Sequence, residues 1–147
     1  MKHRLLSLLT CISSITLPAQ AQEKTHPDTV KVGIYVTSIH DIDFKQKEYA
    51  ITLWLWMKYK NRQLNFQQNL EVPMAKTFEK SFSTIDSSGE DVTLLMKLQC
   101  VMKDSWRIGN FPFDRQALRF SIENSQFDSR SMVFVADIYF ITQASSK

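Results

Sequence analysis

The sequence predicts an all-β protein, a two-sheet antiparallel β-sandwich with an immunoglobulin-like layout. From residue 28 onward, short segments alternate between apolar and polar residues and are rich in β-branched and aromatic side chains. No stretch of the chain keeps a helical period. Once an N-terminal leader is removed, about 126 residues remain, which is enough for one hydrophobic core and hardly enough for two.

The leader has the features of a secretory signal peptide. A basic start is followed by an apolar run over residues 5–17, and Ala19 and Ala21 form an Ala-x-Ala cleavage site. This run is shorter than the roughly 18 to 20 residues that span a bilayer, which disfavours a membrane anchor. A lipoprotein signal at Cys11 is also disfavoured, because the threonine before it is a poor fit to that motif. We expect removal of residues 1–21 and a location on the periplasmic or extracellular side of the inner membrane.

Export limits what holds the mature chain together and what it binds. Loss of two basic residues with the leader lowers the formal charge from +3 to +1, so nucleic acid is not an expected partner. Cys100 is then the only cysteine, and no internal disulfide can form, so apolar burial must stabilise the fold. We predict a flexible N-terminus over residues 22–29, the sandwich over 30–141 and a tail over 142–147.

The first two strands are predicted from alternation with a period of two. The first, residues 30–36, places four side chains on one face: Val30, Val32, Ile34 and Val36. The second, residues 48–60, is apolar on both sides around its middle, with Trp54 and Trp56 on one face. Its other face carries Tyr49, Ile51, Leu53, Leu55, Met57 and Tyr59. The two tryptophans either line a ligand pocket or pack between the sheets, and packing is favoured because this strand is apolar on both faces.

The later strands follow a poorly patterned region, residues 61–82, in which Pro73 interrupts a possible strand. The sequence DSSGED at residues 86–91 is the best hairpin turn. The strand after this turn is predicted to bury the face that carries Val92, Leu94, Met96, Leu98, Cys100 and Met102. Cys100 is therefore predicted to be a core thiol and not a nucleophile. Residues 117–123 send Leu118, Phe120 and Ile122 inward, and a last, mostly apolar strand covers residues 131–141.

Residues for catalysis or metal binding are scarce. His26 falls in the predicted flexible N-terminus, and no Cys or His cluster has the spacing of a zinc site. The chain has no glycine-rich phosphate loop and no recognisable nucleophile context. Asp41 and Asp43, next to His40, are either a weak cation site or a solvated acidic loop between strands, and the second is the commoner case. We expect no enzyme activity, no cofactor and no metal.

One short segment resembles a known motif. Phe111, Pro112, Phe113 and Asp114, followed by Arg115 and Gln116, resemble the aromatic-Pro-Phe-Asp-x-Gln signature of the Cys-loop, or Pro-loop, in pentameric ligand-gated ion channels. In that family the signature joins two strands of the extracellular sandwich at the end facing the membrane. Eukaryotic members flank it with two cysteines, and by spacing those positions here are Asp104 and Leu118. The chain is thus similar to the bacterial branch, which lacks that disulfide.

Other segments resemble the same family in the same order. Residues 32–49, which include His40, Asp41 and Asp43, resemble the first strand, the membrane-facing loop and the start of the second strand. Residues 59–64 match the spacing of the family's Trp-x-Asp-x-Arg-Leu and its final Leu. Residues 125–138, with Gln126, Asp128 and Arg130, resemble loop B and the strand after it. The resemblance covers most of residues 30–139.

The departures limit what the resemblance implies. Glu71 stands where loop A of the family has a tryptophan. The sequence ends at Lys147, before the segment that would carry loop C, the last two strands and four transmembrane helices. We therefore expect the sandwich to be incomplete at its C-terminal strands and the chain as written to form no pore.

The Pro-loop has two interpretations. Proline fixes φ and removes a donor, so the two flanking phenylalanines form a rigid aromatic knuckle that presses into the channel domain in the family. Alternatively, both rings fold under their own sandwich and cap its end beside Trp106 and Ile108.

The resemblance implies the ligand-binding, extracellular domain of a bacterial pentameric ligand-gated channel. Its expected partners are a small-molecule ligand, other copies of the chain in a pentamer, and the channel domain at the membrane. In the family the ligand lies between subunits, which makes Trp54, Trp56, Gln126, Asp128 and Arg130 the candidate pocket residues. The alternative is a stand-alone secreted β-sandwich that serves as a periplasmic binding or assembly module without channel activity.

Overall fold

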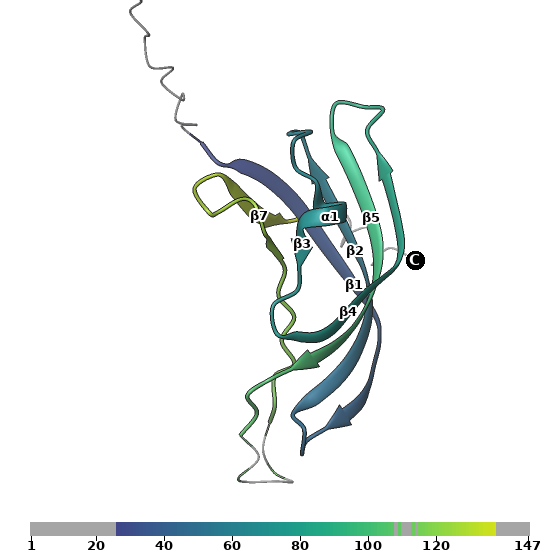
Figure 1. The fold of residues 1–147 in the computed structure, drawn as a ribbon, viewed down its shortest axis with the longest axis vertical. Coiled ribbons are helices and arrows are strands. Elements are labelled where there is room, and N and C mark those ends of the chain that lie inside the picture. Colours follow the sequence, from purple (N-terminus) through teal and green to yellow (C-terminus); the bar gives the residue numbers. More distant parts are fainter. Residues whose placement is uncertain (1–25, 108, 110–112, 114, 138–147) are drawn as a thin grey trace, which may run out of the picture.

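A computed structural model describes residues 26–137 apart from 108, 110–112 and 114, and it contains seven strands and one short helix (Figure 1). The strands are β1 (Asp28–Asp43), β2 (Glu48–Tyr59), β3 (Leu70–Glu71), β4 (Ala75–Asp86), β5 (Val92–Lys103), β6 (Glu123–Asn124) and β7 (Met132–Ala136). The helix is α1 (Phe66–Asn69). The predicted all-β fold is confirmed. The first strand begins at Asp28, two residues before the predicted start of the sandwich.

The strands form two sheets. The larger has five strands in the order β4-β5-β2-β1-β7, and the smaller pairs β3 with β6. Every pair is antiparallel, as predicted, except β1 and β7, which run parallel from Asp28 opposite Met132 to Val32 opposite Ala136. The expectation of a wholly antiparallel sandwich is therefore wrong at this edge. Between β5 and β7 the chain passes through β6 in the second layer. This crossover allows β7 to lie beside β1 and to run in the same direction.

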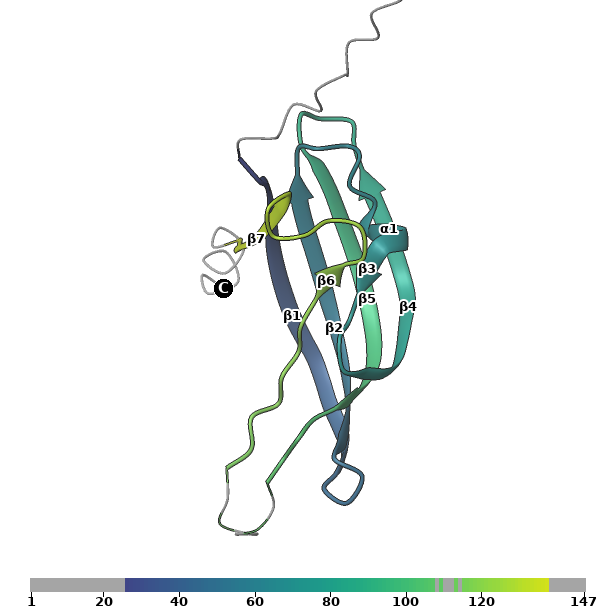
Figure 2. The same ribbon diagram turned by 60° about the vertical axis from the view of Figure 1, so that its left-hand side comes forward.

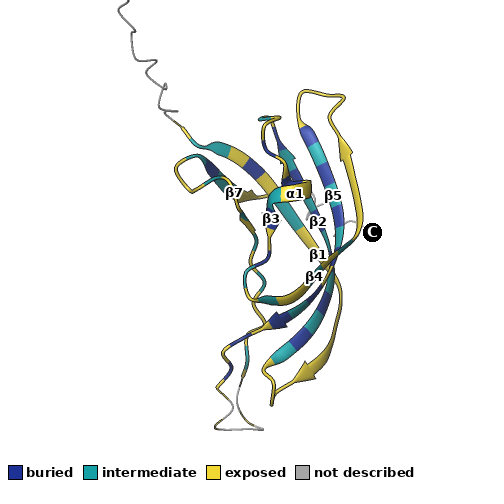
Figure 3. Cartoon of the chain, in the orientation of Figure 1, coloured by how far each residue is buried: buried dark blue, intermediate teal, exposed yellow. Residues whose placement is uncertain are grey.

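The core lies on one face of the larger sheet. Along β2 and β5, alternate residues are buried, and the two series face each other across the ladder, as where Leu53 pairs with Leu98 (Figure 3). The predicted division of β2 into two faces is confirmed, and the predicted inward face of β5 is confirmed in full, with Cys100 3% exposed. Burial raises the pKa of the Cys100 thiol to about 11, so it stays neutral at physiological pH.

The second layer is small. α1 places Phe66 in the core, and its N-cap Asn65 accepts a hydrogen bond from the backbone N–H of Gln68 at 3.3 Å. Pro73 divides β3 from β4, as predicted, and Met74 beside it has a left-handed φ of 67°. β3 and β6 pair over only two residues each. This layer therefore covers only part of the core face of the larger sheet.

The small second layer leaves one predicted face partly uncovered and makes one predicted strand wrong. In β1, Val30 is buried, but Ile34 and Val36 are each 42% exposed although they face the same way. Residues 117–122 form no strand, and Leu118 is 37% exposed. Phe120 and Ile122 do pack against the core, as predicted. Apolar and polar residues alternate in both segments, as the sequence indicates. An apolar face is buried only if a second layer lies opposite it, however, and a segment forms a strand only if another strand is there to share backbone hydrogen bonds.

The hairpin between β4 and β5 confirms the predicted turn at residues 86–91. Asp86 Oδ1 accepts hydrogen bonds from the backbone N–H and the hydroxyl of Ser88, at 2.9 and 2.7 Å. These bonds lower the pKa of the Asp86 carboxyl, the backbone bond contributing most.

Candidate functional site

Two segments that are far apart in the sequence lie at one end of the molecule. The tip of the β1–β2 hairpin and the described residues of the segment from Asp104 to Arg119 lie toward the lower end in Figures 1 and 2. We call this end the base. The base contains the residues that resemble the membrane-facing loop of the channel family, together with the described residues within and around the Pro-loop motif, among them Phe113.

The two segments contact each other at the start of the Pro-loop region. The backbone N–H of Asp104 donates to the carbonyl of Lys47 at 3.0 Å. The ring of the buried Trp106 lies 5.6 Å from the ring of Phe44 in the hairpin and 5.9 Å from the ring of Tyr49, on which it is stacked. Burial, with a smaller effect of the Asp104 charge, raises the pKa of Tyr49. Trp106 therefore fixes the hairpin and the Pro-loop region to each other.

An ion pair closes the neck of the Pro-loop region. Arg119 donates from Nη1 to Oδ1 of the buried Asp104 at 3.2 Å, and Oδ1 also accepts from the N–H of Ser105 at 2.6 Å. Trp106 Nε1 donates to the carbonyl of Ala117 at 3.3 Å. By spacing, the family's disulfide would join Asp104 to Leu118, one residue from Arg119. The ion pair thus closes the loop where the resemblance places a covalent bond.

The Pro-loop residues are described only in part. Phe111, Pro112 and Asp114 lie outside the described residues. Phe113 is 92% exposed, so its ring does not fold under the sandwich, and that alternative is wrong for this residue. Ile42 and Phe44 in the hairpin are 45% and 39% exposed. The base therefore presents apolar side chains from both segments to its surroundings.

The acidic pair at the hairpin serves the turn. Asp41 and Asp43 lie in the last part of β1 and not in a loop between strands. Asp43 Oδ1 accepts from the backbone N–H groups of Lys45 and Gln46, both at 2.8 Å. Asp41 has a left-handed φ of 51°, and its Oδ2 lies 2.8 Å from His40 Nδ1. Among the described residues, no group of three or more His, Cys, Asp or Glu side chains is arranged to hold a metal ion.

The loop B candidates lie in the turn before β7. Asp128 accepts hydrogen bonds from the hydroxyl of Ser131 at 2.9 Å and from Nε of Arg130 at 3.0 Å, and these bonds, with the serine first, lower the pKa of Asp128. Gln126 accepts from Nδ2 of Asn69 at 2.8 Å, which connects this turn to α1 in the second layer. The turn is therefore ordered by its own side chains.

Trp54 and Trp56 lie on the face of the larger sheet that is opposite the core. Both are partly buried and alternate with the buried side chains of β2. The favoured expectation, that they pack between the sheets, is wrong. Trp54 meets the ring of Phe82 edge-on at 5.7 Å, and the ammonium of Lys97 lies 5.8 Å from its ring centre. Trp56 Nε1 donates to Oδ2 of the buried Asp137 at 3.3 Å.

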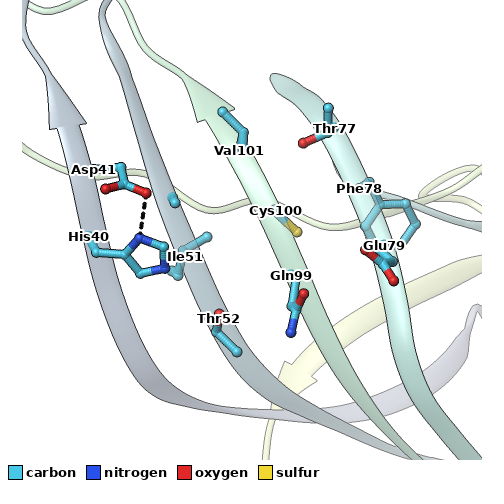
Figure 4. Close-up of a pocket in the computed structure, with 11 residues that line it drawn as sticks. His40, Asp41, Ile51, Thr52, Thr77, Phe78, Glu79, Gln99, Cys100 and Val101 are labelled. Atoms are coloured by element: carbon cyan, nitrogen blue, oxygen red, sulfur yellow. Dashed lines mark hydrogen bonds and ion pairs between the residues drawn. The ribbon is translucent and has the colours of Figure 1, made fainter.

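A depression of about 580 Å³ lies across the larger sheet on the outer face (Figure 4). Polar side chains from four neighbouring strands surround it: His40, Thr52, Thr77, Glu79 and Gln99. Sequence reasoning missed it because each of these residues is an ordinary solvent-facing position within its own strand. Only the pairing register brings Thr52, Gln99 and Glu79 into one row.

No protein family model matches the chain, and no curated protein matches it either. None of the described helices is long and apolar enough to cross a membrane.

Proposed function

We propose that this chain is the extracellular, ligand-binding-type domain of a bacterial pentameric ligand-gated channel, with loop C and the pore carried by a segment beyond residue 147. The proposal rests on the contacts between two segments at the base. The segment that resembles the membrane-facing loop and the residues just before the Pro-loop motif are joined there through the Trp106–Phe44 ring contact and the Asp104–Lys47 hydrogen bond. If the two sequence resemblances were due to chance, there would be no reason for the two segments to lie at the same end of the sheet.

The base also has the chemistry that coupling to a channel domain needs. Phe113, Ile42 and Phe44 expose apolar surface, while the buried Trp106 and the Asp104–Arg119 pair hold the backbone beneath them. A surface of this kind transmits a displacement of one segment to the other, because the two share a packed aromatic contact.

The candidate pocket residues support a site between subunits. Gln126 is bound to the second layer through Asn69, whereas Trp54 and Trp56 lie on the opposite face of the larger sheet. One chain does not bring these residues together. In the proposed ring, the site would form between the loop B turn of one copy and the tryptophan face of the next.

A separate observation supports a second candidate function. The polar depression on the outer face is a concave site with hydrogen-bonding side chains from four strands. It supports a stand-alone exported binding module that needs no second subunit.

The experiment joins the chain to the part of a bacterial pentameric channel of known currents that supplies loop C, the last two strands and the pore domain. Five-fold assembly is measured by native mass spectrometry, and currents are recorded in liposomes. We expect pentamers whose gating is weakened by Phe113→Ala and Phe44→Ala at the base. Ile85→Ala, at the opposite end on β4, is the matched control. Monomeric chimeras, or gating that is equally insensitive to all three variants, would contradict the proposal.

A further inference from the structure

Three aromatic side chains follow one row across the outer face of the larger sheet. Tyr35 in β1 pairs with Trp54 in β2, and the row continues through Lys97 in β5 to Phe82 in β4. Tyr35 is 62% exposed and Phe82 is 46% exposed, and the Phe82 ring meets the Trp54 ring edge-on. From β1 to β4 the row crosses three strand spacings, about 14 Å. We call Tyr35, Trp54 and Phe82 the aromatic row.

Hydrogen-bonding side chains form the next row on the same face. Thr52 and Gln99 pair with each other and lie two residues along their strands from Trp54 and Lys97, so the two rows are neighbours. Glu79 pairs with Gln99 and extends this row into β4. Figure 4 shows Thr52, Gln99 and Glu79 on three neighbouring strands around the depression of about 580 Å³. The side chains of Gln99 and Glu79 are exposed, so a ligand can reach them.

The charges beside the two rows disfavour ionic ligands. The ammonium of Lys97 lies 5.8 Å from the centre of the Trp54 ring, where it takes the place that a ligand cation would occupy over the negative face of the ring. The carboxylates of Glu79 and Asp41 border the depression and repel an anion. A wholly apolar ligand would remove water from Gln99 and Glu79 without replacing their hydrogen bonds. A neutral ligand that has both apolar faces and several hydroxyl groups fits these conditions.

We propose that the outer face of the larger sheet binds a neutral oligosaccharide, whose pyranose rings lie on the aromatic row and whose hydroxyl groups bond to Thr52, Gln99 and Glu79. The C–H groups on a pyranose face carry a small positive partial charge, which the negative face of an aromatic ring attracts. A carboxylate accepts hydrogen bonds from hydroxyl groups, and an amide both donates and accepts them. The inference rests on the second candidate function, the exported binding module, and names its class of ligand. It needs no second subunit.

The test titrates the exported chain with linear hexasaccharides of glucose, of mannose and of N-acetylglucosamine, and with choline as a cationic probe. Calorimetry measures the affinity, and NMR shifts locate the site. We expect at least one hexasaccharide to bind with a dissociation constant of about 1 mM or lower and to shift the signals of Thr52, Trp54 and Gln99. Choline should leave these signals unchanged. Failure of all three hexasaccharides to bind would overturn the inference, and binding of choline in that case would leave the second candidate function in place.

Substitutions in the aromatic row test its part in binding. Tyr35→Ala and Phe82→Ala each remove one exposed ring and should weaken hexasaccharide binding about tenfold or more, whereas Tyr35→Phe keeps the ring and should bind normally. Ile85→Ala is the matched control, because Ile85 is also in β4 and also 46% exposed but pairs with the buried Leu94 and so lies on the other face. Equal binding by Tyr35→Ala, Phe82→Ala and Ile85→Ala, or shifts confined to the loop B turn, would refute the site.

Discussion

The indole of Trp56 covers Gly33 on the neighbouring strand. A Cβ built on Gly33 would lie 2.0 Å from Cε2 and Cζ2 of Trp56, far inside van der Waals contact. The absence of a side chain at Gly33 lets the indole lie across β1, and from there its Nε1 reaches Asp137 just after β7. One glycine thus allows one tryptophan to connect three strands, β2, β1 and β7, at the parallel edge of the sheet.

Gly33→Ala should therefore destabilise the fold. The indole must leave its position and lose the Asp137 hydrogen bond, at a cost of about 1–3 kcal/mol, which is typical of overpacking. Chemical denaturation followed by tryptophan fluorescence measures this. Gly89→Ala is the matched control, because its Cβ meets nothing closer than 4.0 Å. Equal stability of the two variants would show that Trp56 does not lie on Gly33.

Removal of the Arg119 guanidinium should loosen the neck of the Pro-loop region. Arg119→Ala leaves the buried Asp104 carboxylate without its cation, and we expect a loss of about 1 kcal/mol because Arg119 itself is largely exposed. In the Asp104→Asn background the same substitution should cost nearly nothing. Additive effects of the two substitutions in urea titrations would argue against the ion pair.

Cys100 should react with thiol reagents only when the sheet opens. Its pKa of about 11 and its burial keep it neutral and covered between pH 7 and 9. Cys100→Ser places a hydroxyl in an apolar site and should cost about 1–3 kcal/mol. Labelling of the native protein is followed by mass spectrometry. Labelling as fast as in urea would mean that β5 faces the other way.

Glu48 should contribute to acid sensitivity. Lys103, and then Lys76, lower the pKa of the Glu48 carboxyl below its ordinary value of 4.5. A carboxyl whose folded pKa is lowered stabilises the fold above pH 4.5, and this contribution is lost as the pH falls through the folded pKa. Glu48→Gln should therefore flatten the fall in melting temperature below pH 4.5. Parallel pH profiles for Glu48→Gln and the unmodified chain would exclude the effect.

Export should be followed by cleavage after Ala21, leaving Gln22 as the first residue of the mature chain. The basis is the Ala-x-Ala site and the short apolar run before it. Intact-mass measurement of the exported protein decides this prediction. A retained leader, or a lipid on Cys11, is the contrary result.

The alternation of apolar residues by itself determined the two central strands and which of their side chains share a face. β2 and β5 are central in the larger sheet, so a period of two divides each into two faces; in β5, whose other face is polar in part, it also identifies the buried face. The same rule found the turn at residues 86–91 and the break at Pro73, because turn residues act locally. The resemblance to the channel family also came from short local motifs, and it stays a proposal.

Only the tertiary structure decided what lies opposite each face. It put Trp54 and Trp56 on the outer side, paired β7 parallel to β1, and left Ile34 and Val36 exposed, because the second layer stops at β6. It also brought Lys47 to Asp104 and Arg119 to the same carboxylate, which no local pattern encodes. A strand's periodicity states which residues share a face, but burial and contact depend on segments distant in sequence, whose placement is set by the packing of the whole sheet.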